Sequence, residues 1–337
     1  MTIKDIAKLA GVGVGTVSRV LNNHPDVTDK TREKVLQVIR ENNYQPNSNA
    51  KHLKQQHSSS IAIIVKGTHN MLFADLVEQI QALLLKSGEE SGVYYLDEEA
   101  NEVAYALRLC RERHPKGILF LGGNLEYFQE SFGAIQVPCV LMTNTAKELG
   151  FANLSSVTTD DVEASARAIE LLIREGHEKI GVLGGKVSCM QISYYRLRGC
   201  QECFHRHGRS FDVIRHYEAC RFSFQGGYDA AGRLLERDPE LTAIFATSDM
   251  MAVGVIRALQ DMGKRVPEDI SVVGYDGISM GQFVFPRLAT IQQDTHQMAV
   301  RGTEILLRSI ERKTRAIHEV IPFQLLTGES VARVTEG

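Results

Sequence analysis

Three polar side chains, Thr16, Ser18 and Arg19, lie between apolar residues that recur at helical spacing in segment 14–21. A helix is narrow enough to enter the major groove of DNA, where its polar side chains meet the base edges. An arginine in that position can donate two parallel hydrogen bonds to a guanine, which is worth about 1–3 kcal/mol of base discrimination. The segment therefore predicts a DNA-reading helix, with Arg19 as its main base-reading residue.

Short helices on either side are expected to position this segment. Thr2 is predicted to cap a first helix over residues 3–10, and Gly11 ends that helix in a tight turn. Thr28 is predicted to cap a third helix after segment 14–21. Two helices joined by a short glycine turn form a helix-turn-helix unit. The same shape also serves in protein-interaction modules, so periodicity alone leaves both uses open.

Charge is unevenly distributed along the 337-residue chain, whose length suits at least two domains. Residues 1–57 carry nine Lys and Arg against five Asp and Glu, a net charge of +4, whereas the rest carries −7. A basic head on an acidic body indicates a polyanionic partner. No apolar run suits a membrane span and the N-terminus shows no secretion signal, so we expect a cytoplasmic protein rather than a secreted solute receptor.

One cluster contains residue types that ligate zinc: Cys200, Cys203, His205 and His207 fall within eight residues. The stretch also has helical periodicity, and four ligands so close on one helix cannot easily surround a metal tetrahedrally. The chain has six cysteines, which should be free thiols in a reducing cytoplasm. We therefore expect no metal and no other cofactor.

From residue 60 onward, short apolar segments alternate with longer amphipathic ones. This alternation is typical of an α/β fold with doubly wound parallel sheets, in which ligands bind beyond the carboxyl ends of the strands. Residues 60–337 are enough for two such lobes. The expected strands are 61–65, 93–96, 118–121, 180–183, 243–246 and 271–274, and the expected helices are 74–86, 103–113, 161–174 and 250–262.

The motifs of common α/β enzymes are missing from the sequence. No glycine-rich dinucleotide fingerprint opens a helix, and the segment 183–187, Leu-Gly-Gly-Lys-Val, is too short for a Walker phosphate loop. Asp249 and Asp276 could serve as the carboxylate pair of a glycoside hydrolase, but the sequence does not fix the distance between them. We therefore expect a protein that is not an enzyme.

The N-terminal segments 3–12, 16–22, 31–35 and 43–47 closely resemble the headpiece of the lactose/galactose repressor family. The resemblance implies that the second helix lies in the major groove. The DNA-contacting residues it implies are Thr2, Val14, Gly15, Thr16, Ser18, Arg19, Asn22 and Leu53. The chain departs from the family at Gly13, Val14 and Gly15, where a serine cap and larger polar residues are common. Base reading is therefore expected to depend on Arg19 and Thr16.

The segment 47–56 is similar to the hinge helix of that family, which forms when two copies meet on DNA. A helix this short is unstable alone in water. Leu53 occupies the position that wedges into the minor groove and kinks the duplex. The resemblance therefore implies a homodimer on a pseudo-palindromic operator. A flexible tether with an incidental leucine is the alternative.

The remainder of the chain resembles the family's effector domain, which is similar to periplasmic sugar receptors. The segments that carry this resemblance are 176–185, 196–199, 246–254, 273–276 and 289–294. The resemblance implies a headpiece over residues 1–57 and an effector-binding and dimerisation domain over residues 58–337. It also implies three crossings between the lobes. Lobe one is expected over about 60–159 and 292–319, and lobe two over about 160–291 and 320–337.

The same resemblance implies an effector cleft lined by Phe73, Arg198, Phe222, Ser248, Asp276 and Gln293. Carboxylate, guanidinium and amide groups would exchange hydrogen bonds with hydroxyls, and the aromatic faces would stack on a ring. The chain is thus expected to be a DNA-binding repressor that a sugar or sugar derivative releases from its operator. A purine or nucleoside effector and a protein coregulator are the alternatives.

Overall fold

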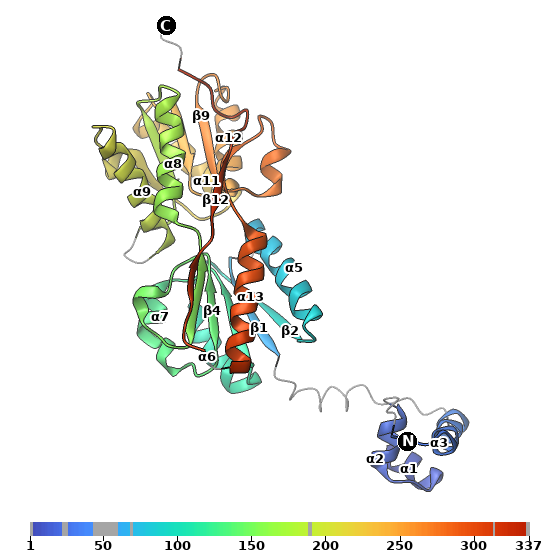
Figure 1. Ribbon diagram of the computed structural model, residues 1–337. Helices are drawn as coiled ribbons and strands as arrows, with labels where there is room; N and C mark the ends of the chain where they lie inside the picture. Colours follow the sequence, from blue (N-terminus) through green and yellow to red (C-terminus); the bar gives the residue numbers. More distant parts are fainter. Residues whose placement is uncertain are drawn as a thin grey trace. The chain divides into compact units, whose positions relative to one another are not determined.

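The computed structural model describes residues 3–21, 26–42, 60–67, 70–187, 191–312 and 314–334. The chain divides into two compact units, residues 1–58 and 59–337, which Figure 1 shows in one ribbon diagram. Several sequence-based predictions lie outside the described residues: Thr2, Asn22, Cys189 and the hinge segment 47–56 with Leu53.

The first unit contains the three expected helices, α1 (Ile3–Ala10), α2 (Val14–Leu21) and α3 (Asp29–Glu41). Gly11 joins α1 to α2 with φ of +61°, a left-handed conformation that favours glycine. Thr28 precedes α3 with extended backbone, as a capping residue does, although its hydroxyl lies 2.9 Å from the Thr31 hydroxyl rather than on a backbone N–H. The buried core of the unit consists of Ile6, Ala7, Ala10, Val17, Val20, Val27 and Val35.

Lobe one of the second unit is built on a parallel sheet with the strand order β11-β5-β4-β3-β1-β2. Its strands are β1 (Ile61–Lys66), β2 (Ser91–Leu96), β3 (Gly117–Leu121), β4 (Cys139–Met142), β5 (Leu154–Thr158) and β11 (His318–Val320). Helices α5 (Met71–Lys86) and α13 (Thr295–Arg312) cover one face, and α6 (Glu102–Arg113) and α7 (Leu125–Ser131) cover the other (Figure 1). Strands β3 and β4, at the centre of the sheet, consist almost entirely of apolar residues because both faces are buried.

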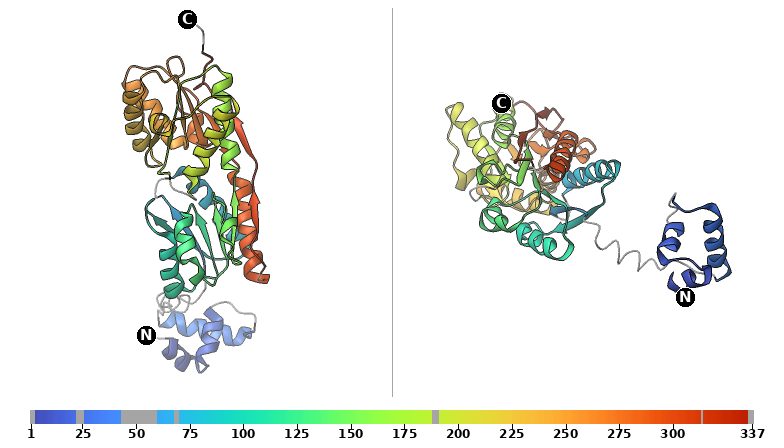
Figure 2. Two further views of the ribbon diagram at one scale, coloured as in Figure 1. Left: turned by 90° about the vertical axis from the view of Figure 1, so that its left-hand side faces the viewer. Right: turned by 60° about the horizontal axis from the view of Figure 1, so that its bottom comes forward.

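Lobe two repeats this design with the strand order β12-β10-β9-β8-β6-β7, in which only β12 is antiparallel. Its strands are β6 (Ile180–Gly184), β7 (Tyr217–Ala219), β8 (Ala243–Ala246), β9 (Ser271–Asp276), β10 (Ala289–Gln293) and β12 (Phe323–Leu326). Helices α8 (Asp161–Arg174) and α9 (Ile192–Arg206) cover one face, and α11 (Phe224–Arg237) and α12 (Asp249–Asp261) cover the other (Figure 2). The shorter helices of lobe two are α10 (Val213–His216) and the 3₁₀ turn Ser279–Gln282, and those of lobe one are the 3₁₀ turns Phe132–Ala134 and Lys147–Leu149. The predicted α/β fold class is confirmed.

The chain crosses between the lobes three times: from β5 to α8, from β10 to α13, and from β11 to β12. Strand β10 pairs with β9 as far as Gln292, so it belongs to lobe two and lobe one resumes after Gln293 rather than at residue 292. The crossings leave each sheet near one edge, formed by β11 and β5 or by β12 and β10. Strands β2 and β7 form the opposite edges.

No helix in the described ranges has the length and apolar character of a transmembrane span.

Neighbouring helices pack closely within the lobes. A Cβ atom on Gly199 of α9 would overlap the carbonyl oxygen of Val162 in α8. A Cβ atom on Gly232 of α11 would come no closer than 3.4 Å to the flexible end of Met262.

These two helical glycines form a matched pair for a packing test. We expect Gly199→Ala to lower the free energy of unfolding by about 1–3 kcal/mol, since backbone must shift. We expect Gly232→Ala to leave it unchanged or to raise it by up to about 1 kcal/mol, the helix-propensity gain of alanine. Urea unfolding of the full chain followed by circular dichroism measures both, and equal effects would contradict this packing.

Candidate functional site

Helix α2 presents the residues that were predicted to read DNA. Val17 and Val20 are buried against α1 and α3, which turns Val14, Gly15 and Arg19 outward. Thr16 is half-buried, and the side chain of Ser18 lies outside the described part of the unit. The helix therefore has the amphipathic form of a recognition helix, with a packed face and an exposed polar face.

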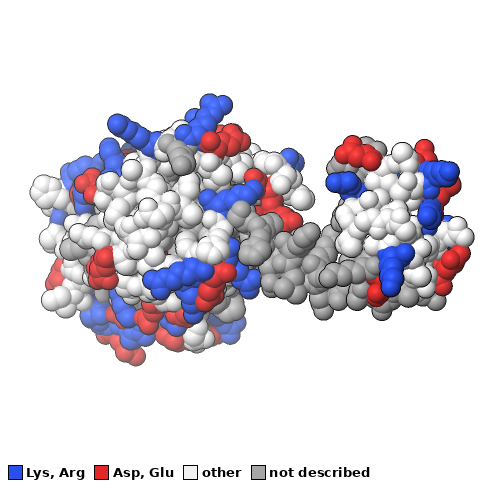
Figure 3. All heavy atoms as spheres, turned by 90° about the horizontal axis from the view of Figure 1, so that it is seen from below, with Lys and Arg blue, Asp and Glu red and all other residues white. Residues whose placement is uncertain are grey.

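Glycine opens α2 on both sides of Val14. The Gly13 carbonyl accepts the Val17 backbone N–H at 3.2 Å, so Gly13 occupies the cap position. A Cβ atom on Gly15 would meet nothing within 4 Å. On the face seen in Figure 3, Lys and Arg side chains of this unit stand beside acidic ones, so charge alone does not mark a DNA-binding face.

A cavity of about 970 Å³ lies between the lobes of the second unit. Its walls are the carboxyl ends of strands from both sheets and the loops that follow them, which is where ligands bind in doubly wound folds. Phe73, Phe222 and Asp276, three of the predicted effector residues, line it. Arg198, Ser248 and Gln293 do not line it.

The two phenylalanines lie against glycines at the ends of central strands. Gly122 follows β3 with φ of +75°, and a Cβ atom there would come within 3.0 Å of the Phe73 ring. A Cβ atom on Gly185, after β6, would come within 2.7 Å of the Phe222 ring. Both rings therefore depend on a bare backbone beneath them, and they add flat apolar surface to a polar cavity.

The arginine of α9 that lines the cavity is Arg196, and the prediction of Arg198 is corrected. Arg196 is 4% exposed, and its Nε donates to Asp161 Oδ1 at 2.8 Å. Its guanidinium lies 3.8 Å from the centre of the Tyr275 ring. Arg198 is 51% exposed and pairs with Glu202, one turn along α9. Residues two apart on a helix face opposite sides, so only one of the two arginines can face the cavity.

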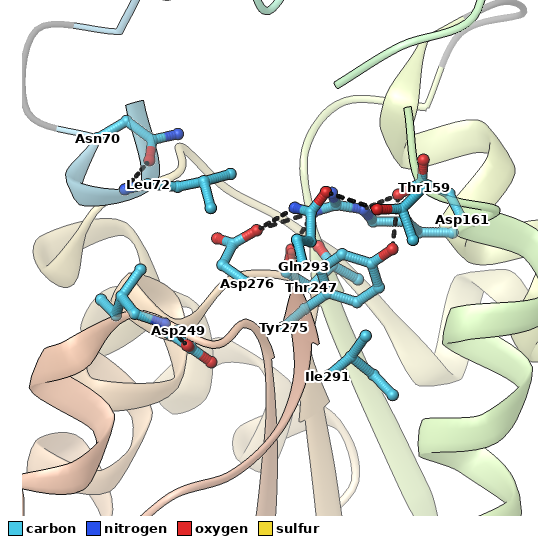
Figure 4. A network of polar contacts seen from close by, with 12 residues as sticks. Asn70, Leu72, Thr159, Asp161, Thr247, Asp249, Tyr275, Asp276, Ile291 and Gln293 are labelled. Atoms are coloured by element: carbon cyan, nitrogen blue, oxygen red, sulfur yellow. Dashed lines mark hydrogen bonds and ion pairs between the residues drawn. The ribbon is translucent and has the colours of Figure 1, made fainter. Parts of the chain in front are cut away.

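Asp276 is the last residue of β9, and its carboxylate accepts hydrogen bonds from side chains that do not line the cavity (Figure 4). Gln293 Nε2 donates to its Oδ1 at 2.9 Å, and the Ser248 hydroxyl also donates to its carboxylate. Thr159, at the first crossing, donates to Gln293 Oε1 at 3.1 Å. Ser248 and Gln293 are therefore buried supports of Asp276. A hydrogen-bonded chain joins the cavity to a crossing.

Burial governs the carboxyl groups around the cavity. Desolvation raises the pKa of Asp276 to about 6, although the Arg196 guanidinium opposes the shift. Desolvation also raises the pKa of Asp161, again against Arg196. Asp249, the other member of the possible hydrolase pair, is fully buried outside the cavity lining. It accepts hydrogen bonds from the Thr290 hydroxyl and the Ile278 backbone N–H, which is a structural arrangement.

Lobe one contributes polar groups that the sequence analysis missed. Lys66 ends β1, donates to the buried Glu102 at 2.6 Å and lies 5.0 Å above the Tyr127 ring. This lobe also contributes three side-chain amides to the cavity lining, those of Asn70, Asn124 and Asn144. These residues could have been predicted from their positions in the sequence, because polar residues that follow buried parallel strands lie at the carboxyl edge of the sheet.

The cysteine and histidine cluster is not brought together. Cys200 and Cys203 are buried in the apolar core under α9, whereas His205 and His207 are exposed. No group of three or more metal-ligating side chains is found among the described residues. Burial raises the pKa of the Cys203 thiol, as for a thiol in an apolar core.

Comparison with known proteins gives consistent matches. The model of the lacI family of bacterial regulatory proteins matches residues 2–47, and that of the periplasmic binding protein-like domain matches residues 169–331. The HTH-type transcriptional regulator MalR of Clostridium butyricum is 36% identical and covers 98% of this chain and 99% of its own length.

Two solved structures are similar over most of the chain. The transcriptional regulator CelR–cellobiose complex has a TM-score of 0.71 and 28% identity, covering 98% of this chain and 99% of that one. A LacI family transcriptional regulator from Enterococcus faecium with bound ribose has a TM-score of 0.71 and 25% identity, covering 82% of this chain and 100% of that one.

The raised pKa of Asp276 predicts that this residue lowers the free energy of unfolding at neutral pH but not at acidic pH. Its carboxyl is ionised above about pH 6 in the folded state and above about pH 4 in the unfolded state. Ionisation of the folded form is therefore unfavourable at neutral pH, and this cost, of order 3 kcal/mol, disappears as the pH falls below about 4. Asp276→Asn should raise the free energy of unfolding at about pH 7.5 but have little effect at about pH 4. Denaturant unfolding at both pH values tests this, and a pH-independent difference would contradict it.

Proposed function

Because the chain belongs to the LacI family of bacterial regulatory proteins and is a DNA-binding transcriptional regulator, we propose that it is a repressor controlled by an uncharged sugar. It binds a pseudo-palindromic operator as a homodimer, and it acts in the cytoplasm, where that DNA lies. The observation that carries the effector part is the cavity between the lobes, with Asp276, Arg196 and two aromatic rings on its walls.

DNA reading is assigned to the exposed face of α2. Arg19 supplies the bidentate contact to guanine, Thr16 a hydroxyl, and Val14 apolar contact with a thymine methyl. Gly15 lets the backbone approach the bases without reading them. Leu53, in the segment 47–56, is proposed on sequence grounds to wedge into the minor groove between the two half-sites.

Charge pairing within the cavity favours a neutral ligand. Lys66 is paired with Glu102, and Arg196 with Asp161. A phosphate or carboxylate ligand that displaced Glu102 or Asp161 would leave a buried carboxylate unpaired, which is costly. The other cations on the lining, Arg221 and Lys186, also have carboxylate partners. Hydroxyl groups, in contrast, can donate to Asp276 and accept from the asparagine amides without disturbing these pairs.

Cavity size and aromatic surface support the same ligand class. Phe73 and Phe222 offer flat faces to the C–H surface of a sugar ring. A cavity of about 970 Å³ is at the upper end of the range for small-molecule sites, so it has room for a disaccharide as well as a monosaccharide. The similar structures with cellobiose and with ribose are consistent with both sizes.

Exposed apolar side chains support self-association. Phe283 and Phe285, between β9 and β10, are 87% and 83% exposed, and Leu85 of α5 is exposed as well. Exposed large apolar side chains favour contact with another protein when they form a patch, and Phe283 and Phe285 are two residues apart in the sequence. A second copy covering these residues would make the homodimer that a pseudo-palindromic operator requires.

The effector proposal is tested by operator binding under a panel of compounds. The panel contains glucose, ribose, maltose and cellobiose, with glucose 6-phosphate, glucuronate and guanine as charged or purine comparators. We expect one neutral sugar to weaken operator binding by about 5- to 150-fold, the usual range of allosteric coupling. Fluorescence anisotropy with the chain's own upstream DNA measures the change. A response only to guanine or to an acidic sugar would contradict the neutral-sugar assignment.

The DNA proposal is tested by Arg19→Ala. Loss of a bidentate base contact should lower operator affinity by about 5- to 150-fold and leave salt-dependent binding to random duplex unchanged. Arg40→Ala, at an exposed arginine in the last turn of α3, is the control and should preserve the ratio of specific to non-specific affinity. Equal loss of both kinds of binding in Arg19→Ala would count against base reading.

A further inference from the structure

Three successive carboxylates follow β2 at the mouth of the cavity and reach across to lobe two. Asp97 Oδ2 lies 2.7 Å from the Arg221 guanidinium, and Glu99 Oε1 lies 2.6 Å from Lys186 Nζ. Between them, Glu98 lies 3.6 Å from Arg221 Nε and accepts the backbone N–H of Phe222 at 3.3 Å. All five side chains belong to residues that line the cavity.

These contacts join segments that only the tertiary fold brings together. Lys186 is 87 positions from Glu99 in the sequence, and Arg221 is 124 positions from Asp97. Other ion pairs on the surface of lobe two, such as Arg265–Asp269 and Arg233–Glu218, have both partners in that lobe and do not connect it to lobe one. The set Asp97, Glu98, Glu99, Lys186 and Arg221, which we call the carboxylate latch, connects one lobe to the other.

The latch lies at the side of the cavity away from the crossings. Strands β2 and β7, after which Asp97 and Arg221 follow, are the last strands of their sheets. The crossings leave the sheets near the opposite edges, at β5 and β11 in lobe one and at β10 and β12 in lobe two. A rotation of the lobes about the crossings therefore moves the latch residues farther apart than it moves any group near the crossings.

The latch also positions an aromatic wall of the cavity. Glu98 of lobe one holds the Phe222 backbone, while the Phe222 ring lies against Gly185 of lobe two. Opening the latch removes the lobe-one support from this residue. The position of Phe222 over a ligand thus depends on whether the lobes are closed.

We propose that the carboxylate latch holds the lobes closed before any ligand binds and positions Phe222 at the cavity mouth. The proposal rests on the proposed function only in that the same cavity receives the effector. The closure that we propose does not require a ligand. A latch that must open to admit a ligand and close to retain it slows both entry and escape.

Exposure of the latch keeps it reversible. Asp97 and Arg221 are both more than half exposed, and such pairs are individually weak and screened by salt. Glu98 is the most buried carboxylate of the three, and desolvation raises its pKa while Arg221 lowers it. Because the latch consists of several weak contacts far from the crossings, binding of a small ligand can shift the equilibrium between closed and open lobes.

The test measures lobe separation in the full chain without ligand. Spin labels attached through p-acetylphenylalanine at the exposed positions Glu112 and Glu236 leave the native cysteines untouched. Because the protein is proposed to be a homodimer, the doubly labelled chain is mixed with an excess of unlabelled chain. Pulsed electron paramagnetic resonance then gives the distribution of distances between lobe one and lobe two of a single copy. We expect Arg221→Gln to increase the wider-distance population by about two- to fivefold, the range for loss of exposed ion pairs. High salt should do the same to the wild-type chain.

A charge swap separates the latch from a general loss of structure. Lys186→Glu alone should widen the distribution, and Lys186→Glu combined with Glu99→Lys should restore it. Arg265→Gln breaks a single-turn pair in lobe two and should leave the distribution unchanged. An unchanged distribution in Arg221→Gln, or a swap that fails to restore closure, would overturn the proposal. No sugar is present, so either result stands apart from the effector test.

Discussion

The buried guanidinium of Arg196 is the constraint on which the rest of the cavity depends. A buried cation is tolerated only when charged and hydrogen-bonding partners surround it. Here Asp161 accepts from Nε, the Thr247 carbonyl accepts from a terminal nitrogen at 2.6 Å, and the Tyr275 ring covers one face. Because Asp161 begins α8, Thr247 follows β8 and Tyr275 lies in β9, one side chain fixes three elements of lobe two around the cavity.

The same group of residues connects a bound ligand to the first crossing between the lobes through hydrogen bonds. Asp276, 4.0 Å from Arg196, is joined through Gln293 to Thr159, which lies where the chain first crosses between the lobes. A ligand hydroxyl that donates to Asp276 competes with or reinforces this chain of hydrogen bonds. The strain of a left-handed Asp276, with φ of +118°, is consistent with a residue held for binding rather than for stability. Lobe closure on the other side is left to weaker, exposed contacts.

Hydrophobic alternation predicted most of the fold, because strands such as Ala243–Ala246 are apolar runs bounded by helices. The site was predicted only in part. Arg198 was chosen over Arg196, yet Arg196 lies four residues before the buried Cys200 and so on the packed face of α9. Asparagines that cap helices and asparagines that line a cavity look alike in sequence, and Asn70 does both. Pairings between lobes, such as Arg221 with Asp97, depend on tertiary structure and leave no local pattern.

If the cavity and the DNA-binding helix act on one equilibrium, sugar binding and operator binding must affect each other reciprocally. Isothermal calorimetry of the effector sugar would be run on the free protein and on the protein saturated with operator. We expect operator to change sugar affinity by the same factor by which sugar changes operator affinity, as thermodynamics requires of coupled sites. Sugar affinity that is identical with and without operator would contradict it.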